Sequence, residues 1–272
     1  MLRLITAILL PITLLCTGAA RAGQPAVETE WELGAALAAL DIPLYPGASQ
    51  SKSYVLPLPF FVLRSPHLVI DEGVRLRLLR TGELHLSLSA DVGVPVNSDD
   101  SLARAGMPDL NTVLQFGPLL ELSLSGARNQ PHHFRLELPL RLALATDLDQ
   151  VDNLGWIAEP RVSYETRRPF KTGFAWQITA GLRYAAGDYH RYYYDVAPAF
   201  ATALRPAFQS GGGYSGFFSD IIANWRENDV IYFALLRYQN LNGAVFEDSP
   251  LVETENYFFL GVGVTWVLAQ SL

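Results

Sequence analysis

Strict alternation of apolar and polar side chains marks the stretch from His132 to Ala145. Its even positions from Phe134 to Leu144 are large and apolar, whereas its odd positions carry two arginines, a glutamate, a proline and two alanines. A period of two predicts a β-strand with one apolar and one polar face. Strands of soluble proteins average about 5–6 residues, whereas a tilted membrane-spanning strand needs about 9–11. The stretch is therefore long enough to cross a membrane, although a long strand of a soluble β-sandwich alternates in the same way.

Comparable runs recur along the chain and predict about twelve strands, an even number as expected of a bacterial barrel. The first two runs are the least regular, and about ten strands would remain without them. The second run contains Pro57 and Pro59, and proline is confined to strand ends, bulges and unpaired edges. The tyrosines from Tyr189 to Tyr194 are assigned to a strand of their own. The predicted strands span residues 31–40, 54–63, 67–79, 83–94, 112–125, 132–145, 154–164, 174–184, 189–194, 214–225, 230–238 and 257–272.

Composition favours a membrane barrel over a soluble protein. Charged residues make up 17% of the chain, against about 25% in a typical soluble protein. No apolar run after residue 22 reaches the length of about 18 residues that a membrane-spanning helix needs. A closed barrel satisfies every backbone hydrogen bond without leaving an edge. We therefore predict an all-β fold, a single antiparallel transmembrane β-barrel.

The first 22 residues predict a secretory signal peptide. Arg3 supplies the positive charge, residues 4–15 are apolar, and Ala20-Arg21-Ala22 fits a cleavage site. Cleavage near Ala22 leaves residues 23–272 as the barrel domain and removes Cys16, the only cysteine. The exported chain is therefore expected to lack disulfides and cysteine metal sites, and to reside in an outer membrane of the Gram-negative type. The formal net charge is −7 and no basic block exists, so nucleic acid is not an expected partner.

Candidate catalytic and metal-binding residues are few. His85 shares the polar face of its strand with Ser87 and Ser89, the one hint of an outer-membrane hydrolase, but such residues also form ordinary hydrogen-bond networks inside a barrel. Asp147 and Asp149 have the spacing of the first ligands of a calcium loop, but no glycine turn or closing glutamate follows at the right distance. We therefore predict no catalytic residue, no metal site and no cofactor.

Several short motifs occur in the order that the MipA/OmpV family shows, and the chain resembles that family over nearly all of residues 23–272. The most specific motifs are Gly106-Met107-Pro108-Asp109 and Asp248-Ser249-Pro250. Two features depart from the family pattern: Tyr193-Tyr194-Asp195-Val196 replaces Tyr-Phe-Gly-Val, and Leu272 stands where a terminal aromatic residue is usual. The resemblance implies an outer-membrane barrel. It also implies a relationship to a scaffold that links a murein-degrading lytic transglycosylase to a murein synthase, although other members are linked to uptake and adhesion.

Two functions fit such a barrel: a scaffold for murein enzymes, or a narrow pore or uptake barrel for small solutes. An outer-membrane hydrolase is a distant third. Twelve strands lie between the about eight that give a filled lumen and the about 16–18 that give an aqueous channel. Inward-facing charged residues could pair across the lumen and plug it, or line a narrow polar path: Arg75, Arg77, Glu121, Arg135, Glu137, Arg141 and Arg183.

The scaffold hypothesis places its partner site on the long connection Pro95–Leu110. Counting strands back from a periplasmic C-terminus, this connection is expected to lie on the periplasmic side as well. The expected partners are outer-membrane lipid, a murein hydrolase and a murein synthase. The candidate partner-binding residues are Arg104, Gly106, Met107, Pro108 and Asp109.

Overall fold

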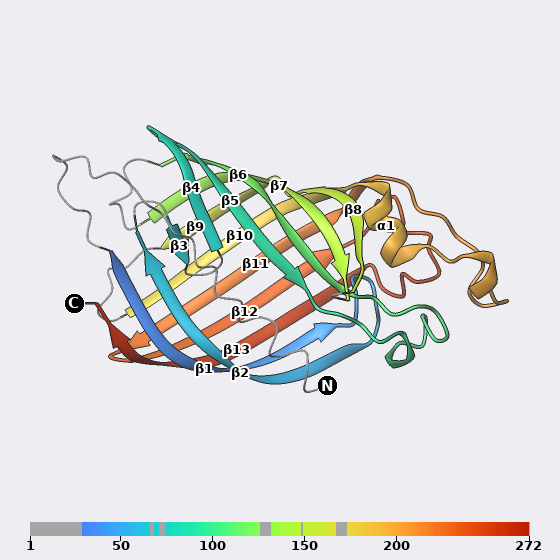
Figure 1. Ribbon diagram of the computed structural model, residues 1–272, viewed down its shortest axis with the longest axis horizontal. Coiled ribbons are helices and arrows are strands. Elements are labelled where there is room, and N and C mark those ends of the chain that lie inside the picture. Colours follow the sequence, from blue (N-terminus) through green and yellow to red (C-terminus); the bar gives the residue numbers. More distant parts are fainter. Residues whose placement is uncertain are drawn as a thin grey trace.

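The computed structural model describes residues 29–65, 68–70, 74–125, 132–147, 149–166 and 173–271. Its strands are β1 (Glu30–Pro43), β2 (Ser51–Arg64), β3 (Leu68–Ile70), β4 (Val74–Thr81), β5 (Leu84–Gly93), β6 (Thr112–Ser123), β7 (His132–Thr146), β8 (Val151–Ala158), β9 (Arg161–Thr166), β10 (Gly173–Ala185), β11 (Gly213–Glu227), β12 (Val230–Asn240) and β13 (Asn256–Gln270). Its helical elements are α1 (Gly187–Tyr194) and the short 3₁₀ turns η2 (Ser98–Asp100) and η3 (Pro198–Phe200). The strands form one antiparallel sheet that closes into a barrel, because β13 pairs with β1 and β10 pairs with β11 (Figure 1).

The described part of the chain contains twelve strand positions around this barrel. The sheet has thirteen segments, but β8 and β9 are two halves of one strand, since both pair with β7 on one side and β10 on the other. The predicted number of strands is therefore confirmed. The two runs that were least regular in sequence are strands of 14 residues each, β1 and β2.

Two errors in the predicted strands cancel in that count. The run 67–79 is not one strand but contains two, β3 and β4, which pair with each other. The tyrosine-rich stretch predicted as a strand is the helix α1. Its buried residues are Tyr189, His190, Tyr193 and Tyr194, a spacing that matches one face of a helix and not the period of two. No helix in the described residues is long and apolar enough to cross a membrane.

The two faces of β7 show how the sequence sets the register of the barrel. Leu136 and Leu138 point outward and are 41% and 44% exposed, whereas Arg135 and Glu137 point into the lumen and are 3% exposed. If the register shifted by one residue, Arg135 would point into the lipid, which costs about 2–4 kcal/mol near the membrane midplane. This cost holds the strand in the register that the alternation predicts. The apolar outer face and the charged inner face are those of a transmembrane barrel.

Aromatic side chains border the apolar outer band at both of its ends. Trp225 and Tyr232 pack together on neighbouring strands with ring centroids 5.5 Å apart. Near the opposite ends of the strands, Tyr238 and Phe258 pack with centroids 5.3 Å apart. Such girdles are typical of the two membrane–water interfaces of a transmembrane barrel.

Both ends of the described chain lie at one end of the barrel, where the Trp31 backbone N–H donates to Ser271 Oγ at 2.8 Å. We name this the termini end. Because neighbouring strands are antiparallel, the connections 44–50, 94–111, 186–212 and 241–255 lie together at the opposite end, the loop end (Figure 1). The expectation that Pro95–Leu110 lies on the same side as the C-terminus is therefore wrong. Because α1 replaces one of the strands predicted between this connection and the C-terminus, the chain crosses the membrane one time fewer between them. The connection therefore lies at the end of the barrel opposite to the C-terminus.

Candidate functional site

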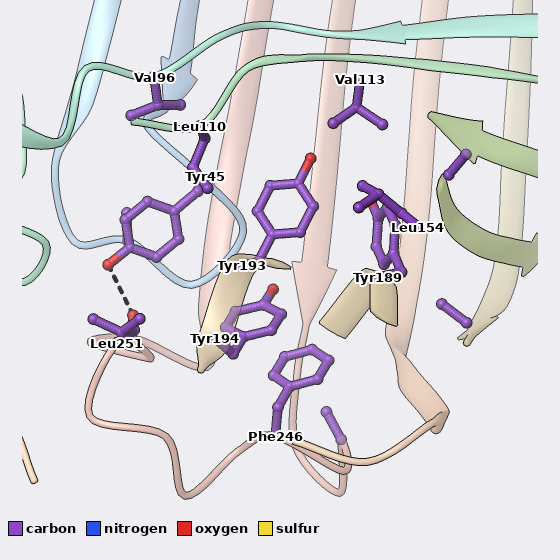
Figure 2. Close-up of a cluster of buried hydrophobic side chains, with 14 of the residues drawn as sticks. Tyr45, Val96, Leu110, Val113, Leu154, Tyr189, Tyr193, Tyr194, Phe246 and Leu251 are labelled. Atoms are coloured by element: carbon purple, nitrogen blue, oxygen red, sulfur yellow. Dashed lines mark hydrogen bonds between the residues drawn. The ribbon is translucent and has the colours of Figure 1, made fainter. Parts of the chain in front are cut away.

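A cluster of buried side chains, here called the cap, occupies the loop end of the barrel (Figure 2). Its members come from the four loop-end connections and from strands on different sides of the wall, including β6, β7, β8, β10 and β13. A continuous cluster that touches opposite walls crosses the lumen. The buried members are Tyr45, Ala48, Val96, Leu110, Val113, Ala143, Ala145, Leu154, Ile157, Ala185, Tyr189, Tyr193, Tyr194, Val196, Leu241, Ala244, Phe246, Leu251 and Tyr257.

Aromatic rings from separate connections hold the cap together. Tyr194 of α1 stacks on Phe246, with ring centroids 3.7 Å apart and planes inclined by 7°. Tyr45 donates a hydrogen bond from its hydroxyl to the carbonyl of Leu251 at 2.9 Å (Figure 2). Burial raises the pKa of Tyr45 to about 12, so this hydroxyl stays protonated as a donor. Each contact links two different loop-end connections that follow one another around the barrel mouth.

The predicted partner-binding residues lie together in the 94–111 connection, but they divide between two roles. Arg104 is 3% exposed and donates hydrogen bonds from Nη1 to the carbonyl of Tyr193 at 2.9 Å and from Nη2 to that of Pro108 at 3.1 Å. Met107 packs against the cap. Gly106, Pro108 and Asp109 are exposed, and Gly106 has a φ of 76°, a conformation that favours glycine.

The position of Arg104 is explained by its neighbours. Its guanidinium carbon lies 5.7 Å from the ring centre of Tyr45. Burial lowers the pKa of Arg104, and the charge is held by backbone carbonyls and an aromatic face. Arg104 therefore ties its connection to α1 and the cap, and it is not a surface residue that a partner can grasp.

Below the cap, paired charges line one wall of the lumen. Glu159 stands between two arginines, with Arg141 Nη1 at 3.0 Å and Arg183 Nη2 at 2.7 Å from its carboxylate oxygens. Glu137 repeats this arrangement with Arg161 Nε at 2.6 Å and Arg135 Nε at 3.5 Å. The sequence predicted inward charges on this wall and left open whether they pair. In the structure they are paired: the contacts of Arg141, Arg183 and Arg161 join neighbouring segments of the wall, whereas Arg135 and Glu137 both belong to β7.

Two further ion pairs cross-link other parts of the lumen. Arg237 Nε lies 2.6 Å from Asp220 Oδ1, on the paired strands β12 and β11. Arg226 Nη1 of β11 lies 2.6 Å from Glu32 Oε1 of β1, although β12 and β13 separate these strands. Because β11 and β1 are three strand positions apart, this ion pair spans part of the lumen near the termini end.

The residues that hinted at a hydrolase lie on the inner face of the barrel wall. His85, Ser87 and Ser89 are buried on the inner face of β5, and Ser89 Oγ accepts a hydrogen bond from Arg141 Nε at 3.2 Å. Asp147 Oδ1 accepts backbone hydrogen bonds from Gln150 at 2.8 Å and Asp149 at 3.1 Å, which lower its pKa and shape a turn. Among the described residues, no group of three or more His, Cys, Asp or Glu is placed to hold a metal ion.

Sequence reasoning missed the contact between His190 and Ser215. His190 Nδ1 lies 2.7 Å from the carbonyl of Gly211, so this nitrogen carries the proton, and Nε2 lies 2.6 Å from Ser215 Oγ. The contact between His190 and Ser215 resembles that of a general base with a nucleophilic serine, but His190 is 0% exposed. It fastens α1 to β11 and is closed to a substrate. Its members are 25 residues apart, and no motif links them.

His190 makes the cap sensitive to acid. Burial lowers its pKa, with a smaller opposing contribution from its hydrogen bond to Gly211; Arg183 of β10 lowers it further. The opened cap therefore binds a proton at higher pH than the closed cap. The contribution of neutral His190 to the stability of the closed cap is fully present above about pH 6.5, the ordinary pKa of histidine, and is lost as the pH falls below that value. We expect faster protease cleavage in the 197–212 segment at pH 5 than at pH 7.5.

The matched control for this prediction is His190→Gln, which removes the titrating ring. In that variant the cleavage rate should be the same at both pH values after correction for protease activity. An equally large acid effect in the variant would contradict the assignment to His190.

Comparisons with known proteins agree with a family assignment over most of the chain. A family model described as MltA-interacting protein MipA matches residues 33–268. No curated protein matches significantly. Among solved structures, a NanC porin is 10% identical with a TM-score of 0.38, covering 87% of this chain and 100% of its own. The toluene transporter TbuX of Ralstonia pickettii is 10% identical with a TM-score of 0.32, covering 89% of this chain and 90% of its own.

Proposed function

The chain belongs to the MipA family, whose description is MltA-interacting protein, and we propose that it is a non-catalytic outer-membrane scaffold for murein-remodelling enzymes. The family description names an interaction with MltA, and the proposal takes a murein hydrolase, with a murein synthase, as the partner class. Residues 1–22, which lie outside the described residues, are proposed to be a signal peptide cleaved near Ala22. Residues 23–272 then form the barrel domain in outer-membrane lipid.

The cap is the observation that favours a scaffold over an aqueous pore. The cap, held together by contacts such as Tyr194 on Phe246, crosses the loop end of the lumen, and ion pairs such as Arg183–Glu159 line one wall beneath it. A solute entering from the loop end would have to displace the cap and then pass the ion-paired wall. A barrel closed in this way is suited to holding a partner more than to conducting.

A planar-bilayer recording tests this choice. The purified barrel should give no steady openings in 1 M salt over a wide range of voltage. Steady single-channel openings of the wild-type chain would overturn the scaffold proposal in favour of the narrow pore or uptake barrel.

The orientation of the barrel decides where a murein enzyme docks. In the proposal the termini end faces the periplasm, so the enzyme binds there and not on the 94–111 connection. Partner binding by Arg104, Gly106, Met107, Pro108 and Asp109 stays a prediction, now for a partner that approaches the loop end. The exposed Gly106, Pro108 and Asp109 supply its surface, and Arg104 and Met107 hold that surface on the cap.

Single cysteines at the two ends test this orientation. Ala105 is exposed at the loop end, and Asp229 is exposed in the turn between β11 and β12 at the termini end. In intact cells, a membrane-impermeant maleimide should label the Ala105→Cys variant and leave the Asp229→Cys variant unlabelled until the outer membrane is permeabilised. The reverse pattern would invert the orientation.

The same two variants test partner docking. The barrel is immobilised in detergent after its cysteine has been coupled to a polyethylene-glycol maleimide, and a murein lytic transglycosylase is passed over it. Retention of the enzyme should be lost when the polymer sits at residue 229 and preserved when it sits at residue 105. Failure of the unmodified barrel to retain the enzyme would reject the scaffold role.

A further inference from the structure

A cavity lies at the loop end of the barrel wall, where β13, β1 and β2 stand side by side in the sheet (Figure 1). The last residues of β1 and the first residues of β2 and β13 line it, together with parts of the 44–50 and 241–255 connections. Its volume is about 350 Å³, within the range of about 300–1,000 Å³ that is usual for small-molecule sites. The cavity is therefore large enough for the headgroup of a lipid.

The outer face of the barrel changes from apolar to polar at this cavity. Asp41 shares the outward face of β1 with Leu37, and its cross-strand neighbours are Leu260 of β13 and Ser53 of β2. Toward the loop end, the outward positions change from Ala39 to Asp41 on β1, from Val55 to Ser53 on β2 and from Phe258 to Asn256 on β13. The cavity therefore lies at the loop-side border of the lipid-facing band, at the level of lipid headgroups.

The two connections beside the cavity are fastened to each other. The backbone N–H groups of Glu253 and Thr254 donate to the carbonyl of Gly47, at 2.8 and 3.1 Å. In return, the backbone N–H of Ser49 donates to Glu253 Oε2 at 3.1 Å. These contacts hold the loop side of the cavity in one shape before any ligand binds.

Asp41 gives the cavity a negative charge. Among the lining residues, all of which lie in the described part of the chain, Asp41 is the one with a charged side chain. Ser51 Oγ lies 3.1 Å from both of its carboxylate oxygens, and Ser53 Oγ donates to Oδ1 at 2.9 Å. An ionised carboxylate accepts about four hydrogen bonds, so the oriented Asp41 can accept a further donor. The neighbouring Lys52 is paired with Asp100 at 2.7 Å.

The β13 side of the cavity combines an amide with an aromatic ring. Asn256 Oδ1 accepts hydrogen bonds from Tyr238 Oη at 2.6 Å and Asn240 Nδ2 at 2.8 Å, which leaves Asn256 Nδ2 as the donor of that side chain. Phe258 is 59% exposed and continues into the apolar outer band, where Leu260 is 50% exposed. A polar site thus lies directly beside a surface that hydrocarbon chains cover.

We propose that the cavity binds the phosphoethanolamine headgroup of a membrane lipid, with Asp41 as the partner of its ammonium group and the acyl chains lying along Phe258 and Leu260. Charge complementarity favours this group, because a primary ammonium has three N–H donors for the carboxylate. The phosphate can accept from Asn256 Nδ2. An anionic headgroup without an amine would instead place a second negative charge beside Asp41. The headgroup can belong to a phospholipid or to a lipopolysaccharide that carries it.

Competition between two zwitterionic lipids tests the proposal by native mass spectrometry of the full barrel in detergent. Phosphatidylethanolamine and phosphatidylcholine with identical acyl chains are added at equal concentration, since the choline group has no N–H to donate. We expect about two- to fivefold more adducts with the ethanolamine lipid, the factor that a partly exposed ion pair contributes. In the Asp41→Asn variant this preference should disappear.

The matched control is Asp149→Asn, the same change at an exposed aspartate in the turn between β7 and β8. It should keep the preference, and both variants should keep the folded gel band. Equal binding of the two lipids by the wild type would overturn the proposal, and so would a preference that survives in Asp41→Asn. Binding of phosphatidylglycerol that requires Mg²⁺ and exceeds that of phosphatidylethanolamine would also overturn it, because Asp41 would then hold a bridging cation.

A second arm distinguishes the two sources of the headgroup. Lipid A with and without a phosphoethanolamine group is compared on the wild type and on Asp41→Asn. A gain from the added group that depends on Asp41 supports lipopolysaccharide as the source, whereas a dependence seen with phosphatidylethanolamine alone supports the phospholipid. Dependence on Asp41 with neither lipid rejects the site. None of these results bears on retention of the murein enzyme, which tests the scaffold proposal separately.

Discussion

Replacing Glu159 with glutamine is expected to destabilise the barrel by about 3–5 kcal/mol, the usual cost of removing one partner from a buried ion pair. Glu159 holds both Arg141 and Arg183 within 3.0 Å. Glutamine keeps the shape of the side chain but leaves two guanidinium groups in the lumen without their shared carboxylate. The measurement is urea unfolding in detergent micelles, followed by the shift of the folded band on a gel run without boiling.

The control is Glu227→Gln, which changes the same residue type at an exposed position at the end of β11. Surface substitutions usually change stability by less than about 0.5 kcal/mol. Adding Arg183→Gln to the Glu159 variant should restore part of the loss, because it removes one of the unpaired charges. A single variant as stable as the control, or a double variant that loses stability additively, would contradict the account of the ion-paired wall.

The inward charges of this wall could be predicted from the sequence, because lipid requires apolar side chains at the outward positions of every membrane-spanning strand. In β7, the outward positions from Phe134 to Leu144 are apolar and the inward positions from His133 to Ala145 are polar, proline or alanine, so faces and register follow directly from the alternation. The predicted strand 132–145 and the observed one, His132–Thr146, differ by one residue. What the alternation does not state is which charges meet. Arg183 and Glu159 are 24 residues apart, and their contact depends on the register of β10 beside β8 and β9.

The errors arose where lipid imposes no such rule. The tyrosines of α1 lie outside the apolar band, and packing in the cap decides their conformation. Their helical spacing was a signal that could have identified the helix. For the run that contains β3 and β4, the intervening Asp71-Glu72-Gly73 has the composition of a turn and could have indicated the break.

The candidate site was located but not interpreted correctly from sequence. The motif around Gly106 drew attention to the 94–111 connection, and the structure places that connection against the cap. The role of Arg104 depends on the Tyr193 carbonyl, 89 residues away. Such a contact follows from the closed barrel and the folded connections, and no local pattern announces it.

Removing the aromatic rings of Tyr194 and Phe246 together is expected to turn a silent barrel into a conducting one. The two rings stack at 3.7 Å in the middle of the cap and are buried, and truncating a buried aromatic side chain to alanine costs about 3–5 kcal/mol. That loss falls on the connections, because the strand pairing and the ion pairs of the wall do not involve either ring. The Tyr194→Ala/Phe246→Ala variant should therefore keep its folded gel band and show openings in a planar bilayer.

Val245→Ala is the matched control, since it truncates the residue next to Phe246, whose side chain is 40% exposed and lies outside the cap. It should remain silent under the same salt and voltage. If the aromatic variant keeps its folded band and is also silent, the ion-paired wall alone closes the lumen, and the cap is not the barrier. If the variant conducts, adding Glu159→Gln should change the size of its openings, because the charged wall then becomes the narrowest part of the path.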